Sequence, residues 1–261
     1  METTSKKSIG QKLVKDIGGK ALWSLERLIA RGSSIPDTPF ISEEHFPWAS
    51  RLEANHELIR SELENVLSQL DDIPNFQDIS TDQVSITRDD NWKTFFLYGM
   101  GYKTERNCLR CPETTRLVES IPDMTTAFFS ILSPGKHIPA HRGVYKGFVR
   151  YHLGLIVPEP KELCRIRVGD EIRYWEEGKS MFFDDTFDHE VWNDTNGTRV
   201  ILFVDVKRPL RLPARLMNDG IIGIVRRTSY VTDAKKNQEE WDQRLATEKG
   251  RQTSPDVVAQ E

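Results

Sequence analysis

The fold class is decided by residues 179–206, KSMFFDDTFDHEVWNDTNGTRVILFVDV. This stretch holds three short runs rich in β-branched and aromatic residues, with turn-forming residues such as Asn196-Gly197 between them. Runs of this kind, bounded by Gly, Asn and Asp, are typical of strands joined by tight turns. We therefore predict three strands, at 179–184, 189–193 and 198–206.

The same pattern of short apolar runs separated by turn residues extends upstream of residue 179. Strand-like runs separated by Gly, Pro or Asp occupy residues 126–133, 148–157, 163–168 and 171–175, and WKTFFLYG at 92–99 indicates an earlier buried strand. Strands do not alternate with helical segments here, which excludes a doubly wound parallel sheet. Seven closely spaced strands predict a mainly β fold, either a two-sheet sandwich or a jelly roll.

Composition narrows the class of protein. The chain has 261 residues, 38% of them hydrophobic, which is enough for a packed core. Lys and Arg number 36 against 40 Asp and Glu, and a net charge of −4 argues against a nucleic-acid partner. The sequence has no secretory signal and no apolar run of about 18 residues. We expect a soluble, cytoplasmic protein whose three cysteines form no disulfide framework.

The N-terminal region, residues 1–40, differs in character from the rest. Residues 9–31 place apolar side chains at helical spacing with lysines between them, and a Gly/Ser/Pro linker follows. A basic amphipathic helix of this kind either packs on the outside of the body or makes peripheral contact with the inner face of a membrane. Both interpretations remain open.

The remaining chain reads as one domain with an extension. We predict a single domain over 41–215, with a helix at about 49–70 packed outside a β-core at about 90–210. Residues 216–261 form a C-terminal extension, and from 232 onward it is polar and lacks periodicity, as in a frayed tail.

Two histidines stand out in the strand-rich part. His141 follows the turn that begins at Ser133-Pro-Gly, and His189 follows the turn that begins at Asp184. In a jelly roll such positions converge at one open end, where neutral imidazoles bind a redox-active divalent metal. The alternative is that each histidine is an ordinary core or surface residue.

Basic residues on the strands that follow the two histidines strengthen the metal interpretation. Arg199 lies on an otherwise apolar strand, and an arginine inside a barrel needs an anionic partner. Arg150 and His152 have the same parity on one strand, so they share a face and, with Ser130, can hold a carboxylate. The structural alternative pairs both arginines with Asp205, Asp184 or Asp185 as salt bridges.

These residues belong to five motifs that occur in a recognisable order: His141-Arg-Gly143, Arg150-Tyr-His152-Leu-Gly-Leu, Trp175-Glu-Glu-Gly, Phe183-Asp-Asp-Thr-Phe-Asp-His189-Glu-Val-Trp and Arg199-Val-Ile-Leu-Phe-Val-Asp-Val. Over about 90–210 the chain resembles the aspartyl/asparaginyl β-hydroxylase family, and it has some similarity to the bacterial lipid A hydroxylases. Family members are dioxygenases that use Fe(II), 2-oxoglutarate and O2 on a double-stranded β-helix, a cupin-like jelly roll.

The resemblance implies a role for each matching residue. His141 and His189 match the iron ligands, and Arg199 matches the residue that grips the distal carboxylate of 2-oxoglutarate. Ser130, Arg150 and His152 match its other polar contacts. His141, His189 and Arg199 are therefore the expected catalytic residues.

The sequence departs from the usual iron site at one position. Two histidines and a carboxylate form the common facial triad, but Gly143 stands where the carboxylate is expected. The open position then holds water, as in the animal β-hydroxylases, or halide, as in the related halogenases. Asp184, Asp185 and Asp188 either bind the imidazole N–H groups or simply form the turn.

The implied substrate differs between parts of the chain. Residues 164–206 are most similar to the animal enzymes that hydroxylate Asp or Asn in peptides, whereas 35–40 (IPDTPF) and 207–210 (KRPL) resemble lipid acyl-chain hydroxylases. We rank an aspartyl/asparaginyl-type or related carboxylate-bearing substrate first. A lipid acyl chain of the lipid A or ornithine lipid type ranks second. A catalytically silent β-sandwich that binds acids through its arginines is the alternative from another class.

Cys108-x-x-Cys111 has the spacing of a redox or zinc motif. A zinc site normally requires four ligands, and no complete set is visible nearby. A structural role for both thiols is the simpler interpretation.

Overall fold

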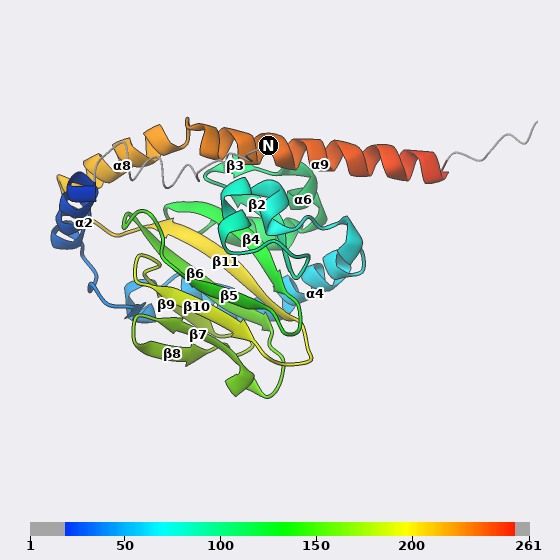
Figure 1. Ribbon diagram of the computed structural model, residues 1–261, viewed down its shortest axis with the longest axis horizontal. Coiled ribbons are helices and arrows are strands. Elements are labelled where there is room, and N and C mark those ends of the chain that lie inside the picture. The colour runs from blue at the N-terminus through cyan, green and yellow to red at the C-terminus, as the bar shows by residue number, and fades with distance from the viewer. Residues whose placement is uncertain (1–18, 254–261) are drawn as a thin grey trace, which may run out of the picture.

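The computed structural model describes residues 19–253, and two antiparallel sheets form its centre (Figure 1). The larger sheet has the strand order β1-β9-β6-β11-β4-β2-β3, and the smaller has the order β5-β10-β7-β8. The strands are β1 Phe40–Ile41, β2 Trp92–Gly99, β3 Tyr102–Lys103, β4 Met124–Leu132, β5 His137–His141, β6 Phe148–Ile156, β7 Cys164–Val168, β8 Glu171–Tyr174, β9 Ser180–Phe183, β10 His189–Asn193 and β11 Arg199–Lys207. The predicted jelly-roll, cupin-like β fold is confirmed.

The local sequence pattern located most of these strands. Each of the seven predicted runs coincides with a strand to within two residues, and the run at 92–99 is β2. The pattern missed β5, whose sequence HIPAH contains Pro139. Proline cannot donate a ladder hydrogen bond and is confined to edge strands. β5 is indeed at the edge of the smaller sheet.

Helices cover the outer face of the larger sheet and the ends of the sandwich (Figure 1). The helices are α2 Gly19–Gly32, α3 Ala49–Ala54, α4 His56–Leu67, α5 Phe76–Ile79, α6 Glu105–Arg110, α7 Pro112–Glu119, α8 Ala214–Val225 and α9 Ser229–Thr253. The helix predicted at about 49–70 is present but divides at Asn55 into α3 and α4. Its buried residues Leu52, Ile59 and Leu63 join the core beneath the larger sheet.

The C-terminal segment differs from the prediction. We expected residues from 232 onward to be a frayed tail, but α9 continues to Thr253. Its helical character comes from good helix formers such as Lys, Glu, Gln and Ala, so no strong apolar stripe marks it in the sequence. Several contacts attach it to the body: Trp241 Nε1 donates to the Asp72 carbonyl at 2.9 Å, Asn237 donates to the Ile79 carbonyl at 3.0 Å, and Arg106 donates to the Asp242 carbonyl at 3.0 Å.

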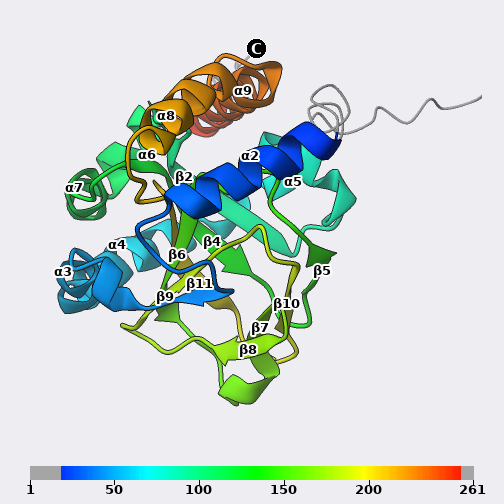
Figure 2. The ribbon, with the colours of Figure 1, turned by 90° about the vertical axis from the view of Figure 1, so that its left-hand side faces the viewer.

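The N-terminal segment is described from Gly19 onward, so residues 9–18 of the predicted helix lie outside the described part. Within that part, α2 packs on the body: Ile29 is fully buried in a cluster with Tyr145 and Ile222. Figure 2 shows α2 crossing one end of the sheets beside α8. Across residues 19–253, every helix is too short or too polar to span a bilayer.

The two cysteines of the Cys-x-x-Cys motif are structural in this fold. Cys108 and Cys111 are both buried in the core cluster beneath the larger sheet, and the Cys108 thiol donates to the Leu97 carbonyl. Burial raises the pKa of the Cys111 thiol to about 12, so the thiolate that metal binding and redox exchange require is scarce at neutral pH.

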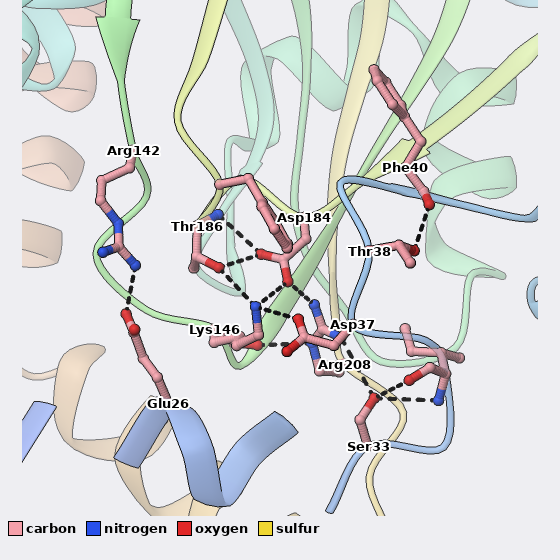
Figure 3. A network of polar contacts seen from close by, with 12 residues as sticks. Glu26, Ser33, Asp37, Thr38, Phe40, Arg142, Lys146, Asp184, Thr186 and Arg208 are labelled. Atoms are coloured by element: carbon pink, nitrogen blue, oxygen red, sulfur yellow. Dashed lines mark hydrogen bonds and ion pairs between the residues drawn. The ribbon is translucent and has the colours of Figure 1, made fainter. Parts of the chain in front are cut away.

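A buried network of polar groups joins the linker after α2 to the ends of three strands (Figure 3). The Asp184 carboxylate accepts from Lys146 Nζ at 2.8 Å, from Arg208 and from Thr186. Lys146 also pairs with Asp37 at 2.7 Å. Asp184 and the Arg208 side chain are fully buried, so each charge depends on its partners for stability.

We expect Asp184→Asn to lower the free energy of unfolding by about 2–3 kcal/mol, because Arg208 loses its buried counter-charge. Urea denaturation measures this change. Asp194→Asn is the matched control, since it removes a partly exposed partner of Arg165 and should change stability by less than about 1 kcal/mol. Equal denaturation midpoints for the two variants would contradict the structural role of the network.

Candidate metal and anion site

His141 and His189 face each other across neighbouring strands of the smaller sheet. They are register partners on β5 and β10, and their ring centroids are 4.1 Å apart at an interplanar angle of 50°. The pairing of β10 with β5 shifts register between His189 and Val191. Irregularities of this kind, such as β-bulges, are common beside functional sites, where they change the direction of a side chain. The predicted convergence of these two side chains is thus observed.

Both imidazoles are oriented in the same way. His141 Nδ1 lies 2.8 Å from the Pro139 carbonyl and His189 Nδ1 lies 3.0 Å from the Phe187 carbonyl. A carbonyl only accepts, so each Nδ1 carries the proton and each Nε2 has a free lone pair. Burial lowers the pKa of His141, and it lowers that of His189 well below its usual range. Neutral rings with free Nε2 atoms are the form that ligates a divalent metal.

Gly143, two residues after His141, has no room for a carboxylate side chain. The Gly143 amide donates to the Asp185 carbonyl at 2.6 Å, and a Cβ at Gly143 would lie 2.4 Å from the Asp185 carboxyl atoms. Arg150 holds that carboxylate at 3.0 Å. Across residues 19–253, no cluster of three or more His, Cys, Asp or Glu side chains is arranged to hold a metal.

We expect Gly143→Ala to lower the free energy of unfolding by about 1–2 kcal/mol, because the added methyl group displaces Asp185 from Arg150. Gly220→Ala is the control: a Cβ there has no atom within 4 Å, and alanine favours the helix. Thermal denaturation of both variants measures the difference. A Gly143→Ala protein as stable as the wild type would contradict this close approach.

The aspartates before His189 belong to other interactions. Asp184 is part of the buried network, Asp185 pairs with Arg150, and Asp188 accepts from Arg167 at 2.7 Å. The imidazole Nδ1 atoms are instead hydrogen-bonded to the backbone carbonyls of Pro139 and Phe187. The interpretation that these residues form the turn is therefore the one that the structure supports.

Arg199 is a buried cation with no acidic partner among the described residues. Its exposed fraction is 2%, its Nε–H has no acceptor, and its guanidinium stacks 4.7 Å above the Trp175 ring. Burial lowers its pKa to about 10, so it remains charged at neutral pH. An isolated buried charge is costly, so an anion bound beside this guanidinium would stabilise it.

His152 contributes a second unused donor beside the same indole. Trp175 Nε1, which can only donate, lies 3.3 Å from His152 Nδ1. Nδ1 is therefore the acceptor, and the neutral ring carries its proton on Nε2. That Nε2 is buried without a partner, and burial holds the pKa of His152 well below its usual range. Phe183 separates this ring from His189.

Ser130 is the third polar residue of this group, and it lies beside Trp92 and Thr94, which the sequence did not mark as site residues. Trp92 Nε1 donates to Ser130 Oγ at 3.0 Å, which leaves the hydroxyl hydrogen free to point into the interior. Thr94, the register partner of Ser130, has a buried hydroxyl with no partner. The signal that could have found both is parity, because Trp92 and Thr94 share a strand face two residues apart.

Arg150 forms the salt bridges to aspartates that the sequence offered as the structural alternative to carboxylate binding. Its guanidinium bonds Asp205 at 3.0 and 3.3 Å, pairs with Asp185, and stacks 4.4 Å from the Phe203 ring. Opposing carboxylates raise its pKa despite its burial. Arg150 and Arg199 thus differ: Arg150 forms ion pairs with two carboxylates, whereas Arg199 forms none with the described residues.

A cleft of about 260 Å³ lies between α2 and two segments near the histidines in sequence. α2 lines it with Glu26, Arg27 and Ala30, and the other lining residues include Arg142, which follows His141, and Phe187, two residues before His189. Glu26 and Arg142 join the two sides by an ion pair of 2.8 Å (Figure 3). α2 therefore packs against a segment that carries one of the histidines.

The chain is similar to several proteins whose names describe hydroxylases or hydroxylase domains. The ornithine lipid ester-linked acyl 2-hydroxylase of Rhizobium tropici is 46% identical over 223 residues, which cover 85% of this chain and 79% of that protein. Human aspartyl/asparaginyl beta-hydroxylase is 41% identical over 128 residues, 47% of this chain and 17% of that protein. Human aspartate beta-hydroxylase domain-containing protein 2 is 32% identical over 188 residues, 67% and 48% of the two chains.

Among solved structures, the cupin domain of a transcriptional regulator from Enterobacter cloacae aligns over 45% of this chain and 97% of its own, at 13% identity and a TM-score of 0.32. The model of the aspartyl/asparaginyl beta-hydroxylase family matches residues 53–209. That match spans more than half of the sequence and contains both histidines and Arg199. The chain therefore belongs to the aspartyl/asparaginyl β-hydroxylase family of hydroxylases.

Proposed function

We propose that this protein is an Fe(II)- and 2-oxoglutarate-dependent dioxygenase that hydroxylates a C–H bond. His141 and His189 would hold the iron, and Arg199, His152 and Ser130 would hold the cosubstrate. The observation that carries the proposal is Arg199, which is 2% exposed and has no acidic partner among the described residues. A dicarboxylic acid supplies the anion that this guanidinium lacks.

The residues present fit both groups. The free Nε2 atoms of the two histidines are suitable ligands for iron, and the wall around Trp175 offers donors to a carboxylate. When bound, iron with 2-oxoglutarate and O2 supplies the oxidising chemistry that converts C–H to C–OH and releases succinate and CO2. The protein's own task is to orient these groups and exclude water.

The chain performs this task by fixing its donors before the ligand arrives. Carbonyls of Pro139 and Phe187 set the two imidazole orientations, and the indoles of Trp92 and Trp175 set the hydrogen-bonding directions of Ser130 and His152. Aromatic side chains of the core between the sheets, including Phe183 and Phe203, surround these donors. Preorganised donors in a dry pocket bind a carboxylate more strongly than the same groups in water.

For the substrate, we propose a lipid acyl chain ahead of an Asp or Asn side chain, the reverse of the order derived from the sequence. Similarity to the ornithine lipid acyl hydroxylase extends over 85% of this chain, whereas similarity to human aspartyl/asparaginyl beta-hydroxylase covers 47%. The wider match includes regions outside the catalytic core. An aspartyl/asparaginyl substrate is the second candidate, favoured by the 41% identity within the core.

The test is turnover by the purified protein with ferrous iron and 2-oxoglutarate. We expect succinate formation, and we expect ornithine lipid, rather than an Asp- or Asn-containing peptide, to gain the mass of one oxygen atom. Oxygen addition to the peptide alone would favour the second substrate. Absence of succinate from folded, iron-supplied protein with either substrate would favour the silent binding module, and a chlorinated product would indicate halide at the open iron position.

A further inference from the structure

Helix α8 and the turn before it expose an apolar stripe. Leu212, Leu216 and Ile224 are 70%, 67% and 65% exposed. The buried positions of α8 are Ala214, Asn218 and Ile222. The exposed positions are offset from the buried ones by two residues, about 200° around a helix, so the stripe faces directly away from the body.

The body holds α8 in this orientation. Tyr145 Oη donates to Asn218 Oδ1 at 2.6 Å, and Asn218 Nδ2 donates to the Gly147 carbonyl at 3.1 Å. α2 crosses at Gly32, where a Cβ would lie 2.4 Å from the Ala214 Cβ. A rotation that buried the stripe would break these contacts, so it stays exposed within the described part of the molecule.

The charges without an ion-pair partner around the stripe are basic. Arg211, Arg215 and Arg227 are exposed and form no ion pair within residues 19–253. Asp219 is the one acidic residue of α8, and Lys207 neutralises it at 2.6 Å. The whole chain carries a net charge of −4, so this cluster is a local basic surface on an acidic protein.

We propose that Leu212, Leu216 and Ile224 with Arg211, Arg215 and Arg227, together the α8 surface, dock the protein on an anionic lipid bilayer. An amphipathic helix inserts its apolar face at the boundary between headgroups and acyl chains, while flanking arginines bind anionic headgroups. A second copy is a poorer occupant, because a symmetric dimer through this face would bring the two sets of arginines together.

Docking in this way has a consequence for the candidate site. α8 packs against α2, and α2 lines a cleft together with Arg142 and Phe187, which lie within two residues of His141 and His189 in sequence. The α8 surface would thus bring the cleft close to the bilayer. The docking proposal rests on exposure and charge alone and does not depend on the reaction proposed above.

Co-sedimentation of the full chain with vesicles tests the proposal. We expect binding to phosphatidylcholine vesicles that contain phosphatidylglycerol, and much weaker binding to phosphatidylcholine alone. The triple variant Leu212→Gln, Leu216→Gln, Ile224→Gln should reduce partitioning roughly 100-fold. Ile172→Gln is the matched control, because Ile172 is 51% exposed on β8, at the end of the molecule opposite α8 (Figure 1).

A second variant tests the charges separately. Arg211→Gln, Arg215→Gln, Arg227→Gln should weaken binding to the anionic vesicles about tenfold or more and flatten its dependence on salt. Circular dichroism melts confirm that both triple variants remain folded. Succinate formation with a water-soluble substrate should be unchanged in both, so loss of docking is distinguishable from loss of the site.

Three results would overturn the proposal. The first is a wild-type chain that does not sediment with anionic vesicles, and the second is an apolar triple variant that sediments as well as the wild type. The third is a wild-type protein that does not bind vesicles but forms a dimer by light scattering, with the dimer lost in the apolar triple variant; the occupant of the α8 surface would then be a second copy.

Discussion

Replacing either His141 or His189 with alanine is expected to reduce 2-oxoglutarate turnover by a factor on the order of 10³ or more, because each variant would remove one of the two histidines proposed to hold iron. Loss of an outer partner of a metal ligand typically costs 10–100-fold, and loss of the ligand itself exceeds that. Within residues 19–253, no group of three or more His, Cys, Asp or Glu side chains is arranged to hold a metal, so we expect no third side chain to take over the role of either histidine. Iron content after anaerobic loading should fall with activity.

His137→Ala is the matched control for both variants. His137 lies on the same strand as His141 but is exposed, pairs with Glu190 at 2.7 Å and stacks on Trp192. Its replacement should leave iron content and turnover nearly unchanged. Normal iron loading in both the His141 and the His189 variants would refute the ligand assignment, whatever their activity.

Arg199→Met is expected to have two opposite effects. It should lower kcat/KM for 2-oxoglutarate by about 100–1000-fold, because a desolvated guanidinium no longer meets the distal carboxylate. It should also raise the free energy of unfolding of the ligand-free protein by about 1–3 kcal/mol, since a buried charge without an acidic partner is replaced by an apolar side chain of similar length. A structural arginine would show a loss of stability instead.

Thermal shift measurements separate the two effects. Wild-type protein should gain thermal stability with added 2-oxoglutarate, because the ligand binds only the folded state, and Arg199→Met should not. Arg165→Met is the control, since Arg165 also lies over an indole, 4.8 Å from the Trp192 ring, but pairs with Asp194 near the surface. If Arg199→Met is destabilised and still responds to 2-oxoglutarate, the anion site lies elsewhere.

The strand pattern could be predicted because its signals are local. Alternation of apolar residues and the turn residues between runs identified seven strands, including the one that begins at His189. His141 was placed only after a turn, and the structure shows it on β5 as the register partner of His189. The signal failed where local chemistry was ambiguous. β5 contains a proline, and α9 consists of polar helix formers whose contacts with Asp72 and Ile79 come from the other half of the chain.

The pairing of charges could not be read from the sequence. Arg150 and Arg199 have similar strand contexts, and both had candidate aspartates within reach by spacing. Only the tertiary arrangement places Asp185 and Asp205 against Arg150 and leaves Arg199 beside Trp175. The unused donors on His152 and Thr94 were equally invisible, because a missing hydrogen-bond partner is a property of everything that surrounds an atom.

The sequence alone thus determined the mainly β architecture, the family and the two histidines, since strand periodicity and ordered motifs are properties of neighbouring residues. The tertiary structure decided which arginine lacks an acidic partner among the described residues, why a side chain at residue 143 would displace Asp185, and which face of α8 is exposed. Those features depend on contacts between segments far apart in the chain, and burial and packing are defined only once those segments meet.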